Sequence, residues 1–157
     1  MDNRVVATRL VLEELGFGAS VDTINRRIEA QKLVFLSQQL GIGLGYSYNW
    51  YVKGPYSPSL TKAYYSPEWS LSAGELAKFR LTEQASSAVQ KIRKALEHKP
   101  HNAQRWQWLE LLASIVYLKR VTRLDDAATK QRIADQKPHL NGWVDLAFAL
   151  LRQLEMA

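Results

Sequence analysis

The fold of this chain is decided by residues 31–60, which read QKLVFLSQQLGIGLGYSYNWYVKGPYSPSL. The stretch contains the end of an apolar helix, an aromatic β-prone run, a Gly-Pro turn and the start of another helix. A Gly54-Pro55 pair after so aromatic a run fixes the backbone, while the phenol edges of the tyrosines can stay near water. This combination favours a recognition surface over a catalytic one.

Residues 46–65 are predicted to form a strand followed by a helix. Tyr46, Tyr48, Trp50 and Val52 share one face of a strand of about seven residues. Ser57-Pro58 is typical of a helix start, with serine as the N-cap and proline at the first helical position, so residues 59–65 are expected to be helical. A second short strand is expected over residues 78–81, and the two strands can pair as a wing.

Apolar periodicity predicts that most of the remaining chain is helical. The expected helices cover residues 5–15, a segment starting near Ser20 or Asp22 and running to 40, a short piece ending at 76, and residues 83–99, 106–118, 126–134 and 143–154, with Thr82 and Asn141 as caps. The predicted fold is mainly α with a small two-stranded β-hairpin. Residues 1–100 are expected to form a winged-helix-like core, and residues 101–157 a helical C-terminal extension packed on it within a single domain.

Composition limits the class of protein. The chain has 157 residues, of which 46% are hydrophobic, and its five tryptophans are ample for one buried core. It has no cysteine, which excludes disulfides and thiolate metal ligands and fits a reducing compartment. No apolar run approaches the roughly 20 residues of a membrane span, and charges interrupt the first residues. We therefore expect a cytoplasmic protein without a membrane anchor.

The inventory for catalysis is thin. His98, His101 and His139 have no carboxylates beside them at ligand spacing, and the sequence contains no phosphate-binding glycine loop or hydrolase motif. Asp125-Asp126 is interpreted as a helix N-terminus, where carboxylates interact favourably with the macrodipole. The sequence predicts no catalytic residue, no metal site and no cofactor.

Three residues are expected to support the Gly-Pro corner from inside. Gln31 falls between Ile24, Ile28 and Phe35 on the helical wheel, so its amide should bond to irregular backbone near Gly54-Pro55. Lys32 flanks the same stripe, and a buried ion pair between Lys32 and Glu110 would join the two halves of the domain. Separate solvated charges are the alternative for this pair.

A net charge of +6 makes an acidic partner plausible, whether nucleic acid or protein. The basic residues of the second half that could contact nucleic acid are Lys91, Arg93, Lys94, Lys99, Lys119, Arg120 and Arg123. The helix that would read the major groove carries Lys62, Tyr64 and Tyr65. It has no Arg, Asn or Gln, the side chains that most often recognise bases by paired hydrogen bonds. A nucleic-acid-binding regulator is therefore the second hypothesis.

Four segments carry a resemblance to a known family. They are EAQKLVFL at residues 29–36, YVKGPYSPSL at 51–60, WLELLASIVYL at 108–118, and Lys137-Pro138. In this order the chain resembles the Panacea antitoxin domain family, and especially its smaller bacterial relatives, over most of its length. The resemblance implies a mainly helical, winged-helix-like domain that binds another protein, either neutralising a toxin or presenting a client to a protease. Gln31, Lys32, Gly54 and Pro55 are the positions that match.

The first functional hypothesis is thus a non-enzymatic protein-interaction module of a bacterial toxin-antitoxin or phage-defence system. The residues expected to bind the partner are Tyr51, Lys53, Gly54, Pro55, Tyr56 and Ser57, with aromatic and basic side chains as anchors. The same surface could instead support a homodimer, since exposed patches that bind partners can also bind themselves.

Overall fold

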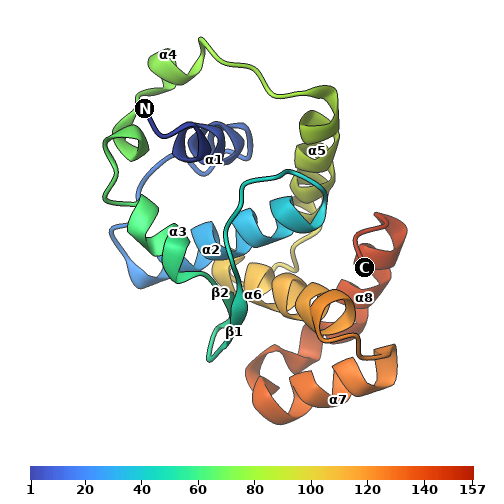
Figure 1. Ribbon diagram of the computed structural model, residues 1–157. Helices are drawn as coiled ribbons and strands as arrows, with labels where there is room; N and C mark the ends of the chain where they lie inside the picture. Colours follow the sequence, from blue (N-terminus) through green and yellow to red (C-terminus); the bar gives the residue numbers. More distant parts are fainter.

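Two largely buried helices, α2 (Ile24–Gln39) and α6 (Arg105–Val116), form the centre of the computed structural model, which describes residues 1–157 (Figure 1). They share the most extensive contact between any two elements of the fold. From Trp108 to Val116 every residue of α6 is buried, because other elements surround this helix. The helix predicted over residues 106–118 is therefore present, and it lies in the core.

The hairpin consists of β1 (Asn49–Tyr51) and β2 (Gly54–Tyr56), which pair antiparallel with Asn49 opposite Tyr56 and Tyr51 opposite Gly54. The mainly α class with a small two-stranded hairpin is therefore confirmed. The second strand was expected at residues 78–81, and this is wrong, because those residues form turns and irregular backbone. A turn at Val52-Lys53 lets the chain pair with itself at once, which costs less entropy than closing a loop to a distant strand.

The helix predicted to start at Ser57-Pro58 is present as α3 (Pro58–Ala63), and the Ser57 side chain caps it by accepting from the Leu60 amide. It is followed by the 3₁₀ helix η1 (Pro67–Ser70) and by α4 (Ala73–Leu76), both of which contact α1 (Asn3–Glu14). Buried Arg9 ties α1 to η1 by donating from Nε to the Trp69 carbonyl at 2.8 Å.

The remaining helices complete the core. They are the amphipathic α5 (Glu83–Glu97), the π-helical turn η2 (Tyr117–Val121) that continues α6, α7 (Asp126–Gln136), the 3₁₀ helix η3 (Pro138–Trp143) and α8 (Val144–Gln153). Two caps differ from the prediction. Thr23 rather than Ser20 or Asp22 caps α2, and Asn141 lies inside η3 instead of capping α8.

The two halves of the chain share one interior. The largest apolar cluster contains residues from Val5 near the N-terminus to Met156 near the C-terminus, and Figure 1 shows α6 beside α2 with α7 and α8 on its other side. None of the helices has the length and apolarity needed to cross a bilayer. The hairpin lies on α2 and α6, which places it over the seam between the halves.

Candidate functional site

Three charged side chains are buried beneath the hairpin: Lys32 on α2, Glu110 on α6 and Lys137 just before η3, each with 2% or less of its surface exposed. Lys32 donates from Nζ to the Pro55 carbonyl at 2.7 Å. Lys137 donates from Nζ to the Val52 carbonyl at 2.7 Å and to Oε2 of Glu110 at 2.8 Å. Two lysines from different parts of the chain thus hold the hairpin backbone.

The predicted ion pair between Lys32 and Glu110 is wrong, because the ionic partner of Glu110 is Lys137. Both residues of the predicted pair instead lie close to Gly54 of the hairpin. A β-carbon placed on Gly54 would lie 3.8 Å from Cε of Lys32 and 3.9 Å from Cγ of Glu110. The amino group of Lys32, which was predicted to bind the Glu110 carboxylate, instead donates to the Pro55 carbonyl.

Gly54 is required at this crossing for two reasons. Its φ of +92° lies in the left-handed region, where side chains are strained. An added β-carbon would also lie 2.7 Å from Oγ of Ser114 on α6, closer than van der Waals contact permits. The absence of a side chain therefore lets the hairpin lie directly on the core helix.

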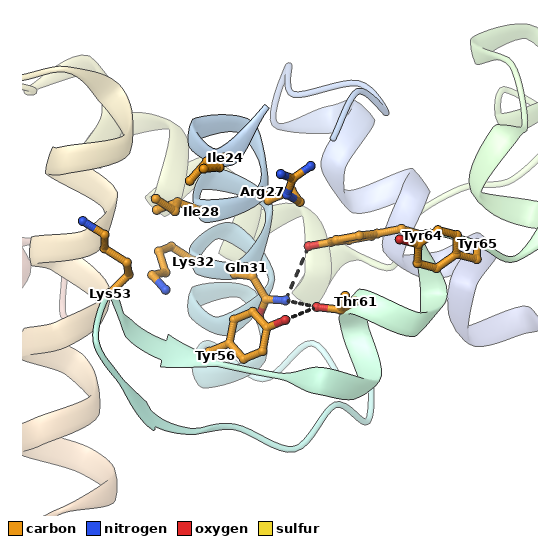
Figure 2. A pocket seen from close by; sticks show the side chains of 10 residues that line it. All are labelled: Ile24, Arg27, Ile28, Gln31, Lys32, Lys53, Tyr56, Thr61, Tyr64 and Tyr65. Carbon is orange, nitrogen blue, oxygen red and sulfur yellow. Dashed lines mark hydrogen bonds between the residues drawn. The ribbon is translucent and has the colours of Figure 1, made fainter. Parts of the chain in front are cut away.

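Gln31 joins α2 to α3, just after the hairpin. Its Oε1 accepts from the Ser57 amide at 2.8 Å, and its Nε2 donates to the Ser57 carbonyl at 3.0 Å. The same Nε2 lies 3.1 Å from Oγ1 of Thr61 and 3.4 Å from the hydroxyl of Tyr64, and Oγ1 of Thr61 meets the Tyr56 hydroxyl at 2.6 Å (Figure 2). The expectation of a buried amide bonded to irregular backbone near Gly54-Pro55 is confirmed. Burial raises the pKa of Tyr64, so its hydroxyl stays protonated.

The residues expected to bind a partner fall into two groups. Tyr51 and Lys53 are exposed and Tyr56 is half-buried, whereas Gly54, Pro55 and Ser57 are buried. Because Gly54, Pro55 and Ser57 are buried, they position the hairpin and cannot offer side chains to a partner. Sequence reasoning missed Val52, which is 88% exposed at the turn, because alternation assigned it to the apolar face of a longer strand.

A pocket of about 480 Å³ opens beside this corner, between α2, the hairpin and α3 (Figure 2). Ten residues line it: Ile24, Arg27, Ile28, Gln31, Lys32, Lys53, Tyr56, Thr61, Tyr64 and Tyr65. Three of them are cationic and none is acidic. The sequence signals for this pocket were the Ile24, Ile28 and Gln31 stripe on α2 and the tyrosines after Ser57, but their convergence depends on the hairpin position.

The electrostatics of the pocket centre on Lys32. Its removal from water is the largest effect and lowers its pKa from 10.5 to about 7, and the positive charges of Lys137 and Lys53 act in the same direction. The negative charge of Glu110 opposes them. Lys32 has no carboxylate within ion-pair distance. It lines the pocket as a buried amino group with a pKa of about 7.

The basic residues of the nucleic-acid hypothesis are largely engaged within the chain. Nζ of Lys99 donates to two backbone carbonyls, Lys119 pairs with Asp126 at 2.9 Å, and Arg120 donates to the Gln39 carbonyl at 2.7 Å. Lys91 and Lys94 line a shallow surface hollow with Gln90.

Arg93 and Arg123 are exposed, and Arg123 has a φ of 63°. The structure has no cluster of three or more His, Asp or Glu residues positioned to hold a metal ion.

Comparisons with family models, with curated proteins and with solved structures found no match to this chain.

Proposed function

We propose that this chain is a protein-interaction module that docks a partner on its hairpin tip, defined as Tyr51, Val52 and Lys53. In this proposal it is a cytoplasmic, non-enzymatic component of a bacterial toxin-antitoxin or phage-defence system, as its resemblance to Panacea-type antitoxins implies. The partner is a toxin or a protease client that offers an acidic and apolar face.

One observation carries the proposal: the apolar tip is exposed while the backbone beneath it is fixed. Val52 is 88% and Tyr51 45% exposed, yet the Val52 carbonyl accepts a 2.7 Å hydrogen bond from buried Lys137. A surface that is already ordered loses less conformational entropy when a partner binds. Exposed aliphatic and aromatic side chains on such a base are typical of binding anchors.

The side chains around the tip suit an acidic and apolar partner. The ring of Tyr51 meets the ring of Tyr56 edge-on at 5.2 Å, which holds it in place. Nζ of Lys53 lies 5.5 Å from the ring centre of Trp106, a cation–π arrangement that leaves the ammonium at the surface. These side chains supply apolar area and positive charge together.

The test compares variants in capture from native lysate. Wild type, Val52→Asp and Leu146→Asp are immobilised, Leu146 being a 49% exposed leucine on α8 that serves as the matched control. We expect a protein that wild type and Leu146→Asp retain and that Val52→Asp loses by tenfold or more. Equal recovery by all three variants, or recovery of nucleic acid alone, would reject the hairpin tip as the docking surface.

The alternative function, a nucleic-acid-binding regulator, is supported by the shared surface of Lys91 and Lys94 on α5. Binding through phosphates would weaken steeply as salt increases. A mobility-shift titration of duplex DNA at low and moderate salt tests it, with Lys91→Ala/Lys94→Ala as the variant. A complex at low salt that this variant loses would favour the alternative, and no complex at low salt would eliminate it.

A further inference from the structure

The pocket beside the hairpin is lined by a buried amino group whose hydrogen bonds are incomplete. Lys32 is 1% exposed, and its amino group makes one hydrogen bond within the chain, to the Pro55 carbonyl. An ammonium has three N–H donors, so two remain without a protein partner. Buried ammonium groups are normally paired, because desolvation without compensation is costly.

The other walls of the pocket favour a negatively charged ligand. Lys53 from the hairpin and Arg27, one turn before Gln31 on α2, add two further positive charges, and no carboxylate lines the cavity. Figure 2 shows Lys32 and Lys53 on one side of the pocket. On the other side Gln31 is bonded to the hydroxyls of Thr61 and Tyr64, and the Thr61 hydroxyl is bonded to that of Tyr56. An anion that enters therefore meets cations without like-charge repulsion.

The remaining lining is apolar and aromatic. Ile28 lies at the buried wall, while Ile24 and Tyr65 are 67% and 87% exposed at the rim. A volume of about 480 Å³ falls within the usual range for small-ligand sites. The cavity thus combines a cationic end with apolar surface, which matches an acid that carries an apolar body.

We propose that this pocket binds a carboxylate carried on an apolar or aromatic body, with the carboxylate bonded to Nζ of Lys32. Binding supplies the counter-charge that Lys32 lacks, and the apolar body covers Ile24, Ile28 and Tyr65. The carboxylate comes from a free organic acid or from an acidic side chain of a bound peptide. Either source takes the same site.

The charge state of Lys32 couples binding to pH. The groups that face it are Glu110 from α6, Lys137 from the segment before η3 and Lys53 from the hairpin, and His139 approaches Oε2 of Glu110 at 3.9 Å. On its own helix Arg27 adds a positive charge, and burial raises the pKa of the nearby Tyr64. Since burial places the pKa of Lys32 at about 7, its ammonium form is abundant at pH 6 and scarce at pH 8.

Calorimetric titration with phenylacetate tests the site, with phenylacetamide as the neutral analogue of the same shape. We expect phenylacetate to bind wild type at pH 6 at least tenfold more tightly than phenylacetamide. Raising the pH to 8 should weaken phenylacetate binding by about tenfold and leave phenylacetamide unaffected. Absence of phenylacetate binding at millimolar concentration, or equal affinity for the two probes, would overturn the proposal.

Substitutions inside and outside the pocket test whether phenylacetate binds there. Lys32→Met should weaken phenylacetate binding at least tenfold, whereas Lys62→Met, which removes an exposed charge on α3 outside the pocket, should leave it unchanged. If Lys32→Met does not fold, Lys53→Met replaces it, because Lys53 is exposed, and a severalfold loss is expected. Equal binding by the pocket variant and Lys62→Met would place the carboxylate elsewhere and overturn the proposal.

A capped peptide, acetyl-Phe-Glu-Phe-amide, separates the two sources. Tighter binding of this peptide than of phenylacetate would identify a partner's acidic side chain as the ligand, and weaker binding would identify a free organic acid. Both results support a carboxylate site. Loss of phenylacetate binding would leave partner capture at the hairpin tip untested by this titration, so the two proposals fail separately.

Discussion

Lys137 donates from Nζ to Oε2 of Glu110 at 2.8 Å, and both side chains are almost completely removed from water. The same ammonium bonds to the Val52 carbonyl, so this ion pair also fixes the turn of the hairpin. The segment before η3, the core helix α6 and the exposed tip are therefore connected through one nitrogen atom.

Breaking this pair should destabilise the protein strongly. Lys137→Met leaves the fully buried carboxylate of Glu110 without its partner, which typically costs about 3–5 kcal/mol in the free energy of unfolding. Urea denaturation measures the change. The control is Asp145→Asn, which removes the exposed pair with Lys130 and should cost no more than about 1 kcal/mol.

The double variant Lys137→Met/Glu110→Leu should be more stable than Lys137→Met alone, because it removes the unpaired charge as well. A single variant that costs no more than Asp145→Asn would show that the pair is not buried in solution.

Lys32 should give the protein a characteristic dependence of stability on pH. Desolvation lowers its pKa in the folded state to about 7 from the 10.5 of a lysine in water. Between these values the unfolded chain binds more protons than the folded one, so the free energy of unfolding rises with pH across this window. Below pH 7 the full cost of the buried charge is present.

The measurement compares urea denaturation of wild type and Lys32→Met at pH 7 and pH 9. Wild type should gain stability relative to the variant as pH increases, by at most about 1.4 kcal/mol per pH unit. Parallel curves for the two proteins would mean that Lys32 stays charged in the folded state throughout.

Gly54 should tolerate no side chain. Gly54→Ala places a β-carbon 2.7 Å from Oγ of Ser114 and forces alanine to a φ of +92°, so a loss of about 2–4 kcal/mol is expected. Gly18→Ala separates the two causes. Its φ is +82°, but nothing lies within 4 Å of the added carbon, so only the backbone cost should remain.

Ser114→Ala in the Gly54→Ala background should restore part of the lost stability by removing the clashing oxygen, which has no hydrogen-bond partner in the chain. Thermal unfolding of Gly54→Ala, Gly18→Ala and the double variant Gly54→Ala/Ser114→Ala measures these losses of stability. Equal losses for Gly54→Ala and Gly18→Ala would contradict direct packing of the hairpin on α6.

Gln31→Leu should cost about 1–3 kcal/mol, because it leaves the buried amide of Ser57 without its partner and removes one of the hydrogen bonds to the Ser57 carbonyl. Chemical denaturation measures the change, and Gln131→Leu on the exposed face of α7 is the control, expected to lie within about 0.5 kcal/mol of wild type. An unchanged midpoint for Gln31→Leu would reject the buried network.

The sequence predicted the parts of this site that follow from local periodicity. Gln31 could be placed because a polar residue at the centre of an apolar helical face needs a buried partner, and the irregular backbone after Gly54-Pro55 was the nearest candidate. The helix start at Ser57-Pro58 followed from capping chemistry. Both features depend only on the spacing of residues within one helix or turn.

The contacts that join distant segments could not be predicted from local residue spacing. Nothing local distinguishes Lys137 from the other lysines, and its pairing with Glu110 depends on how η3 packs against α6. The second strand was misplaced because residues 78–81 alternate as β-prone residues do, while Gly54 and Pro55 were interpreted only as a turn. The pocket likewise arises where α2, the hairpin and α3 converge.

Site-specific photo-crosslinking in the native host is the sharpest test of docking at the hairpin tip. A benzophenone amino acid replaces Val52 in one variant and Leu146 in the other, both exposed apolar positions. If a partner docks at the tip, position 52 gives one specific protein adduct that position 146 does not give. The same adducts from both positions, or no protein adduct from position 52, would contradict it.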